Sequence, residues 1–521
     1  MSAARGWTRR ATLAAGGAAL MLGARASAQN GARVRAPAGD FIGTAENGVL
    51  AFRGIRYGRA ERFRAPVAVN RPGVAIAAQA FGPVCPQSDR QYQPQSEDCL
   101  HLNVWTAEAD PRARKPVMLY IHGGAYSNGS VTDALNDGRH LAARGDVVVV
   151  TVNHRLNAFG YLYLARLDPR FPNSGNNGQL DLVLALRWVR DNIAAFGGDP
   201  GRVLVFGQSG GGAKIATMMA MPAADGLFHR AVTMSGQQVT ASGPLNATAR
   251  ARAVLGKLGV AEGDLSPLLT VPQERLVDAL SATDPILGGG VYMGPVLDMR
   301  HLLRHPFWPD AHPQGLRVPM ILGNTRDETR AFIPPNSAKV KELNWDNLPA
   351  RMAPELRIDI LPEWVVAQYR RRFPAMSPLD VFYDATTAGR SWRGQVIEAE
   401  ERARAGAPAW VYQLDFGSRT DPRRGAFHTM DIPLAFGTLD APGSQTGTGP
   451  DARAASQALQ GALVAFAKTG DPNHRGLPTW PRYDLDRRAT LIVDAVTRVG
   501  NDPRRWQREL FARVPYIQPG T

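Results

Sequence analysis

Cysteine and lysine are scarce in this chain of 521 residues, which contains two of the former and six of the latter. Two cysteines are too few for a cysteine-rich zinc site or an iron–sulfur cluster. The sequence has no repeat of 20–50 residues and no heptad pattern, which excludes a solenoid and a fibre. Its 44% hydrophobic and 20% charged residues exclude a disordered chain and predict a large folded core.

The excess of basic residues is almost entirely arginine. Sixty Lys and Arg residues face 46 Asp and Glu residues, giving a net charge of +14. Such a charge can attract nucleic acid, a membrane surface or an acidic substrate. The arginines, however, are scattered among acidic residues, with no basic arm and no interleaved aromatic residues. We interpret the charge as a solubility feature and expect no nucleic-acid partner.

Residues 1–28 are predicted to be an export signal. Arg9 and Arg10 precede a short apolar stretch that ends in Ala26-Ser27-Ala28. A positive start, an apolar middle too short to span a membrane, and small residues before the cleavage point define a signal peptide. The paired arginines resemble a twin-arginine signal, with an ordinary secretory signal as the alternative. Residues 29–521 would then form the mature protein, in the periplasm or secreted.

The two cysteines, Cys85 and Cys99, are separated by thirteen residues. In an oxidising compartment we expect them to form a disulfide with each other. Closing a loop of this size stabilises the fold by about 3 kcal/mol in the chain-entropy model. Two buried free thiols are the alternative.

From residue 117 onward, short apolar runs alternate with helical patterns. Helices are expected over 178–196 and directly after Ser209, and strands over 117–121, 147–152, 203–206, 231–234, 318–322 and 410–414. Strands separated by helices predict an α/β fold, in which a mostly parallel sheet carries helices on both faces. No linker-like segment interrupts residues 30–515, so we expect a single large domain.

The segment Gly207-Gln208-Ser209-Gly210-Gly211 lies between a predicted strand and a predicted helix. This is the context of the G-x-S-x-G nucleophile elbow. The serine backbone is strained in so tight a turn, and the residues two positions before and after it must therefore lack side chains. The turn lifts the hydroxyl above the edge of the sheet, so we predict that Ser209 is a nucleophile.

A second glycine-rich segment, His122-Gly123-Gly124-Ala125-Tyr126, follows an earlier predicted strand. Acyl transfer from an ester requires N–H donors aimed at the point where the tetrahedral oxyanion forms. Small residues allow the backbone to approach that point. We predict that the N–H groups of Gly124, Ala125 and Gly210 form this oxyanion hole.

Further motifs occur in a fixed order around these two segments: Ser96-Glu97-Asp98-Cys99-Leu100-His101-Leu102-Asn103-Val104, Asn153-His154-Arg155-Leu156, Phe196-Gly197-Gly198-Asp199-Pro200 and Trp480-Pro481-Arg482-Tyr483. Together they resemble the type-B carboxylesterases, the α/β-hydrolase family that includes the cholinesterases and many bacterial esterases. The resemblance covers nearly the whole mature chain. It implies the α/β-hydrolase fold and a serine ester hydrolase that forms a covalent acyl-enzyme, with no metal or organic cofactor.

The resemblance also implies a catalytic triad of Ser209, Glu328 and His428. The order serine, acid, histidine is that of the α/β-hydrolases, and Glu328 follows a predicted strand. Asp327 is the competing acid. The resemblance further implies a disulfide loop and two internal salt bridges: Cys85–Cys99, Arg62–Glu97 and Arg155–Asp181.

Two departures from the family pattern bear on the substrate. Gln208 stands where the family usually has glutamate, and the loop between the cysteines contains Tyr92 but no tryptophan. A choline site needs an aromatic face for the quaternary ammonium, so we do not expect cholinesterase activity. The expected partner is a small-molecule ester. Carbamate or amide hydrolysis by the same triad, and a non-catalytic binding protein, are the alternatives; the motifs carry no signal for an oligomeric state.

Overall fold

The computed structural model describes residues 32–520, and the predicted export signal lies outside this range. Its centre is an eleven-stranded sheet with the order β16-β15-β14-β13-β12-β11-β9-β10-β8-β4-β3. The seven strands from β15 to β10 are parallel to one another, and antiparallel strands complete both edges. The strands of this sheet are β3 (Thr44–Glu46), β4 (Val49–Arg56), β8 (His101–Thr106), β9 (Lys115–Ile121), β10 (Val148–Val152), β11 (Gly198–Gln208), β12 (Arg230–Met234), β13 (Met320–Thr325), β14 (Ala409–Leu414), β15 (Ala489–Val493) and β16 (Arg498–Asn501).

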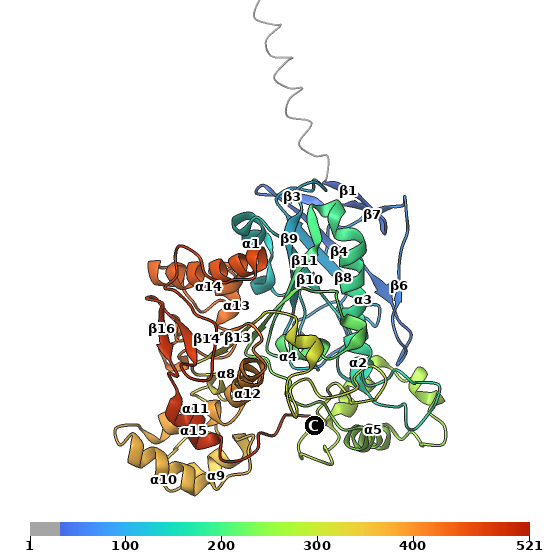
Figure 1. Cartoon of the computed structure of the whole chain (residues 1–521). Helices are drawn as coiled ribbons and strands as arrows, with labels where there is room; N and C mark the ends of the chain where they lie inside the picture. The colour runs from blue at the N-terminus through green and yellow to red at the C-terminus, as the bar shows by residue number, and fades with distance from the viewer. Residues whose placement is uncertain (1–31, 521) are drawn as a thin grey trace, which may run out of the picture.

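The helices lie around this sheet and beyond one of its ends (Figure 1). They are α1 (Arg139–Gly145), α2 (Asn157–Tyr161), α3 (Asn177–Asn192), α4 (Gly210–Met218), α5 (Pro244–Leu258), α6 (Gln273–Asp278), α7 (Pro313–Leu316), α8 (Thr329–Phe332), α9 (Leu348–Met352), α10 (Pro362–Arg372), α11 (Pro378–Ala388), α12 (Ser391–Arg404), α13 (Asp431–Phe436), α14 (Pro450–Thr469) and α15 (Arg505–Phe511). Two small sheets pair β1 (Arg33–Ala36), β2 (Gly39–Ile42) and β7 (Ala75–Ala77), and β5 (Gly58–Arg59) with β6 (Val67–Ala68).

All six predicted strands and both predicted helices are present, and the α/β prediction is confirmed. Neither the antiparallel edge strands nor the parallel strand β15 was predicted. The outermost ones, β3 and β16, are short and mostly polar or partly exposed, so they lack the continuous apolar run of a buried parallel strand.

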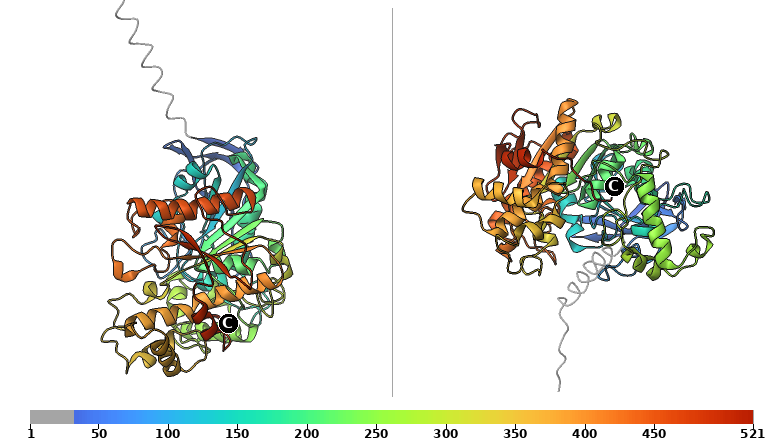
Figure 2. Two further views of the ribbon diagram at one scale, coloured as in Figure 1. Left: turned by 60° about the vertical axis from the view of Figure 1, so that its left-hand side comes forward. Right: turned by 90° about the horizontal axis from the view of Figure 1, so that it is seen from below.

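Each face of the sheet packs against its own set of helices. Successive side chains of a strand point to opposite faces, so β9 contributes Leu119 to one core and Tyr120 to the other. The first core contains residues of α3 and α4, and the second contains residues of α1, α13 and α14. Figures 1 and 2 show α14 and α3 on opposite sides of the sheet.

A third core lies outside the sheet. It joins α9, α10, α11, α12 and α15 through side chains such as Met352, Tyr369, Phe382 and Phe511. Figure 1 shows α9, α10, α11 and α15 together at the end of the molecule beyond the sheet. This end faces the carboxyl ends of the parallel strands, where ligands of open α/β sheets bind.

The strand register brings the predicted site segments to one level. Ile121 at the end of β9 pairs with Gly207 near the end of β11. Met234 of β12 in turn pairs with Gln208 on one side and Gly323 of β13 on the other. The oxyanion segment, the serine turn and the loop after β13 therefore leave the sheet side by side.

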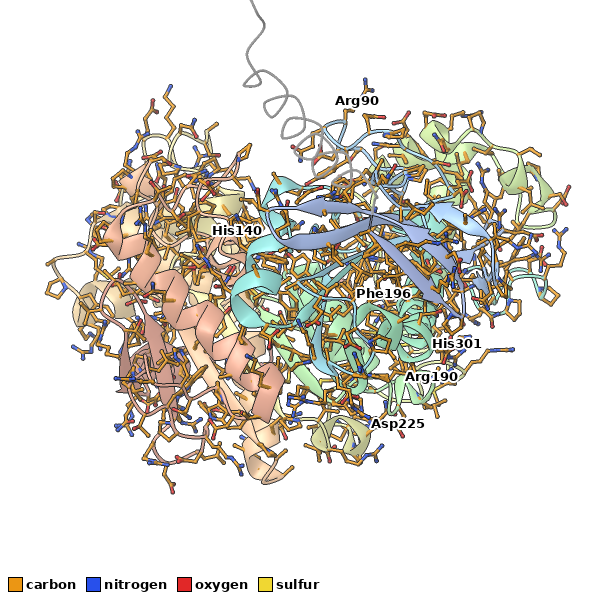
Figure 3. All side chains as sticks on the ribbon, turned by 90° about the horizontal axis from the view of Figure 1, so that it is seen from above. Arg90, His140, Arg190, Phe196, Asp225 and His301 are labelled. Atoms are coloured by element: carbon orange, nitrogen blue, oxygen red, sulfur yellow. The ribbon has the colours of Figure 1, made fainter. Side chains whose placement is uncertain are left out.

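Charged residues such as Arg90, Arg190 and Asp225 are exposed at the surface (Figure 3). Within residues 32–520, no helix has the length and apolar character needed to cross a membrane. The salt bridge predicted between Arg155 and Asp181 is present and buried, with a 2.7 Å contact.

Of the two other predicted pairs, one is present as an ion pair and the other is not covalently bonded. Arg62 and Glu97 form the predicted ion pair. Cys85 and Cys99, by contrast, are both buried free thiols, so the predicted disulfide is absent from the structure. A hydrogen bond with Cys85 and burial raise the pKa of the Cys99 thiol well above its usual range. The two sulfur atoms thus lie next to each other without a bond.

Candidate active site

Ser209 lies in the turn that joins β11 to α4. Its backbone has φ +55° and ψ −125°, an uncommon conformation for a residue with a side chain, and its N–H donates to Met234 O at 2.7 Å. A Cβ on Gly207 would lie 2.6 Å from the carbonyl carbon of Gly211, and one on Gly211 would overlap the carbonyl oxygen of Ile121. The structure therefore contains the steric reason for both glycines.

Glu328 and His428 meet from different strands. Glu328 follows β13 and His428 lies in the loop after β14. The imidazole Nδ1 of His428 contacts Glu328 Oε2 in a short hydrogen bond, and both side chains are buried. An ionised carboxylate can only accept, so Nδ1 carries the hydrogen of this bond, and in the neutral imidazole Nε2 is the nitrogen with the lone pair.

Glu328 is held in place by donors on its other oxygen. Ser235 Oγ donates to Oε1 at 2.6 Å, and the Thr325 N–H donates to it at 2.8 Å. Burial alone would raise the pKa of this carboxyl group. The adjacent His428 and these hydrogen bonds outweigh burial and lower the pKa below its ordinary value, which keeps Glu328 ionised.

Asp327, the competing acid, points elsewhere. Its carboxylate accepts a hydrogen bond from the Ala426 N–H at 2.9 Å and pairs with Arg326 and Arg330. The carboxylate that contacts the imidazole belongs to Glu328.

The Nε2 atom of His428 is hydrogen-bonded to Gln208, the residue that precedes Ser209. The side-chain amide of Gln208 donates to it at 3.1 Å, and Gln208 is 1% exposed. In the described structure no hydrogen bond joins Ser209 to this nitrogen, although both residues line one cavity. Catalytic hydrogen bonds are often long in ligand-free enzymes and tighten when substrate binds.

The predicted oxyanion donors line the same cavity. Gly124, Ala125 and Gly210 surround Ser209 in a space of about 500 Å³. Gly124 and Ala125 both have positive φ, +84° and +52° respectively. Neither of their N–H groups donates to another residue of the described chain, which leaves both free for a ligand oxygen.

Sequence analysis missed Lys214, which supports this loop from behind. Lys214 lies in α4, is fully buried, and donates from Nζ to Ala125 O at 2.6 Å. Its ammonium group is also 4.9 Å from the centre of the Tyr126 ring. Burial lowers the pKa of Lys214 to about 7. The signal in the sequence was a lysine within an otherwise apolar helix, in a chain with very few lysines.

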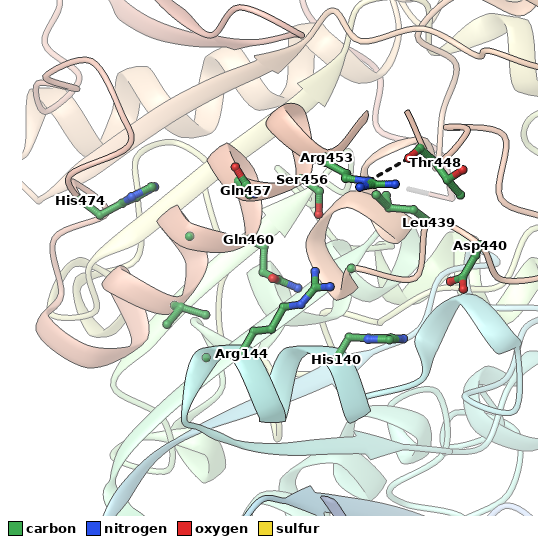
Figure 4. A pocket seen from close by; sticks show the side chains of 14 residues that line it. His140, Arg144, Leu439, Asp440, Thr448, Arg453, Ser456, Gln457, Gln460 and His474 are labelled. Carbon is green, nitrogen blue, oxygen red and sulfur yellow. Dashed lines mark hydrogen bonds between the residues drawn. The ribbon is translucent and has the colours of Figure 1, made fainter. Parts of the chain in front are cut away.

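A larger cavity, of about 630 Å³, lies between α1 and α14 (Figure 4). His140, Arg144, Gln460 and His474 are among the residues that line it, and neither Ser209 nor His428 is. Across residues 32–520, no three His, Cys, Asp or Glu side chains are grouped to hold a metal ion. Ser209, His428 and the predicted oxyanion residues thus share one cavity, and none of them lines the larger one.

A family comparison agrees with this geometry. The model of the carboxylesterase family matches residues 30–510. The chain belongs to the carboxylesterase family. It is a carboxylic ester hydrolase with the α/β-hydrolase fold.

Several relatives are similar over almost their whole length. The para-nitrobenzyl esterase of Bacillus subtilis is 35% identical over 491 residues, covering 90% of this chain and 96% of the relative. The phenmedipham hydrolase of Pseudarthrobacter oxydans is 32% identical over 505 residues, with the same two coverages. The carboxylesterase EST55 of Geobacillus stearothermophilus superposes with a TM-score of 0.82 at 34% identity, covering 92% of this chain and 99% of that structure.

Proposed function

We propose that this carboxylesterase cleaves esters by acyl transfer to Ser209, with His428 as the base and Glu328 as the residue that orients it. One observation carries the assignment. A buried imidazole held by a carboxylate at Nδ1 directs its Nε2 lone pair toward the cavity that contains a strained serine. This is the arrangement that activates a hydroxyl for attack on a carbonyl.

The proposed reaction has two steps. His428 Nε2 takes the proton of Ser209 Oγ as the hydroxyl attacks the ester carbonyl, and Glu328 stabilises the imidazolium that forms. The N–H groups of Gly124, Ala125 and Gly210 receive the oxyanion. His428 then protonates the leaving alcohol, and a water molecule repeats the attack on the acyl-enzyme.

Gln208 affects the first step because its side-chain amide is hydrogen-bonded to the nitrogen that must accept the proton. A neutral imidazole has one lone pair at Nε2. The Gln208 amide must therefore yield that position before Ser209 can transfer its proton. We propose that substrate binding in the cavity displaces the Gln208 amide from His428 Nε2.

Replacing Ser209 by alanine tests the assignment. We expect kcat for a p-nitrophenyl ester to fall by about 10⁴- to 10⁶-fold with the fold intact. Ser281→Ala is the matched control, because that serine is exposed and lies outside the cavity, so it should leave the rate unchanged. Near-normal turnover by Ser209→Ala would remove the assignment. A panel of ester, carbamate and amide substrates with one leaving group then ranks the bond types.

We also propose that the chain is exported, on the pattern of residues 1–28. The mature protein should begin at Gln29, as N-terminal sequencing of the exported enzyme can determine. Arg9→Lys with Arg10→Lys should abolish export through a twin-arginine route while leaving general secretion active. A full-length chain retained in the cytoplasm would contradict export by either route.

In the exported protein, we propose that Cys85 and Cys99 become oxidised to a disulfide. The support is their contact in the buried interior and the oxidising compartment that an export signal implies. Counting thiols in the denatured exported enzyme should give none, against two in enzyme made in a reducing cytoplasm. Two free thiols in the exported enzyme would disprove the cross-link.

A further inference from the structure

Two arginines line the cavity that contains Ser209. They are Arg357 and Arg390, and no Asp or Glu is among the residues that line this cavity. The triad carboxylate, Glu328, lies behind the imidazole and pairs with it. The wall of the cavity is therefore cationic, although a neutral ester needs no cation for binding.

Arg390 is linked to the base by a single aromatic ring. The Phe332 ring lies 4.8 Å from the imidazole of His428, centre to centre. The guanidinium carbon of Arg390 lies 4.6 Å from the centre of the same ring. The sum of these distances, about 9.4 Å, is an upper limit for the separation of the guanidinium from the imidazole. A substrate of modest length can therefore reach both the imidazole and the guanidinium from within this cavity.

The charge of Arg390 is only partly neutralised by its surroundings. Its acidic neighbour is Glu355, at 3.9 Å, and this carboxylate is bound more closely by Lys339 at 2.6 Å. Burial and the charge of Arg357 lower the pKa of Arg390 from its ordinary value. Lys339 and Arg390 therefore share the single carboxylate of Glu355, and Arg357 adds a third positive charge.

Arg357 has still fewer partners. Its backbone N–H donates to Gly389 O at 3.0 Å, which fixes it beside Arg390. Within the described chain, its side chain makes no ion pair or hydrogen bond, and its Nε atom is buried. Because Arg357 lines the cavity and no residue of the described chain accepts from its terminal nitrogens, these N–H groups can donate to an acceptor that enters the cavity.

The polar groups around the pair do not cancel its charge. Tyr292 and Tyr516 also line the cavity, and their phenols can donate hydrogen bonds. Glu398, which lies near Tyr516, is fully buried. Burial raises the pKa of Glu398 to about 8, so this carboxyl group is mostly neutral at pH 7.

We propose that Arg357 and Arg390 form a carboxylate-binding subsite, and that the preferred substrates are esters that carry a free carboxylate, such as half-esters of dicarboxylic and polycarboxylic acids. The planar guanidinium matches a carboxylate with two parallel hydrogen bonds. The subsite rests on the proposed function, since it selects among esters that Ser209 attacks. It also gives a role in binding to two arginines whose charges the described chain only partly balances.

Two substrates that differ in one charge provide the test. Mono-p-nitrophenyl glutarate has a free carboxylate, and methyl p-nitrophenyl glutarate has the same chain and leaving group with the carboxylate masked. We expect kcat/KM to be about 10- to 100-fold higher for the half-ester, the range of a charge-assisted hydrogen bond. A ratio near one, or a preference for the methyl ester, would overturn the subsite.

Variants assign the preference to the two arginines. Arg357→Gln and Arg390→Gln should each reduce the ratio of the two kcat/KM values about tenfold, mainly through KM of the half-ester. Arg357→Lys retains the charge without the planar fork and should retain part of the ratio. Arg475→Gln, an exposed arginine outside this cavity, is the matched control and should not change the ratio. An undiminished ratio in both glutamine variants would show that the preference arises elsewhere.

A binding measurement separates this subsite from the catalytic assignment. Calorimetry of Ser209→Ala with monomethyl glutarate should give binding that Arg357→Gln weakens about tenfold, whether or not the wild-type chain turns over either ester. Hydrolysis without binding selectivity would remove the subsite and leave the esterase assignment in place. Selective binding without hydrolysis by the wild-type enzyme would remove the esterase assignment and leave the subsite in place. Absence of binding would refute the subsite directly.

Discussion

Introducing a carboxylate beside His428, the proposed base, is expected to change the pH dependence of the enzyme in a defined direction. In the structure the Gln208 amide donates to His428 Nε2 at 3.1 Å. In Gln208→Glu the new carboxylate accepts instead, and it favours the imidazolium over the neutral imidazole. The general base is active only when neutral, so more alkaline solution is needed to deprotonate it.

The magnitude follows from the separation. Two unit charges about 4 Å apart interact by about 4 kcal/mol at an effective dielectric constant of 20, which is about three pH units. Water in the cavity reduces this value, so we expect the acid limb of the kcat/KM profile to move up by about 1 to 3 units.

The assay is the pH profile of kcat/KM for a neutral p-nitrophenyl ester, from pH 5 to 9. Gln457→Glu adds the same charge at an exposed position on α14, where solvent and salt screen it, and should leave the limb unchanged. An unshifted limb in an active, folded Gln208→Glu enzyme would show that position 208 does not contact the catalytic base.

Two further predictions concern buried ionisable groups near the site. Lys214→Met removes a charge-assisted hydrogen bond of about 1.5–3 kcal/mol from the carbonyl of Ala125, so we expect kcat to fall about 10- to 100-fold with little change in KM. The control, Lys468→Met at the surface, should have no effect on the kinetics. Equal losses in the two variants would refute a positioning role for Lys214. Burial raises the pKa of Glu398 from 4.5 to about 8, so the native state keeps a proton that the unfolded state releases, and the free energy of unfolding falls as the pH rises from 4.5 to 8. Glu398→Gln removes this dependence, and denaturant unfolding should show the variant gaining stability over wild type between pH 5 and pH 9, by at most about 5 kcal/mol; a constant difference would mean that Glu398 is already ionised.

Much of the fold was predictable because its central strands are local apolar runs. The Val/Thr run that forms β10 and the run ending at Ile121 are buried on both faces, and burial of this kind is visible in the sequence. Edge strands such as β16 are stabilised by pairing with a neighbour rather than by their own composition. No local pattern therefore predicts them.

The candidate site was predictable where backbone geometry restricts residue type. Gly207 and Gly211 are required by atoms that would overlap a Cβ, so their spacing around Ser209 identifies the turn. The family resemblance supplied Glu328 and His428, which lie far apart in the sequence. The contact between Gln208 and the imidazole was not predictable, because it depends on one rotamer in the folded state.

The cationic wall of the cavity was not predictable from the sequence either. Arg357 and Arg390 stand among 60 Lys and Arg residues, and no motif marks them. They become distinctive only when the fold places both at the cavity, where their one carboxylate partner, Glu355, pairs with Arg390 and more closely with Lys339. The overall positive charge, interpreted from the sequence as a solubility feature, therefore includes at least two residues that line the cavity containing Ser209.

The central claim is that one serine forms the acyl-enzyme, and covalent labelling tests it most directly. A fluorophosphonate probe should modify Ser209 and no other serine in the folded enzyme, as peptide mass spectrometry can locate, and His428→Ala should abolish the labelling. Modification of a different serine, or labelling that persists undiminished without His428, would contradict the account.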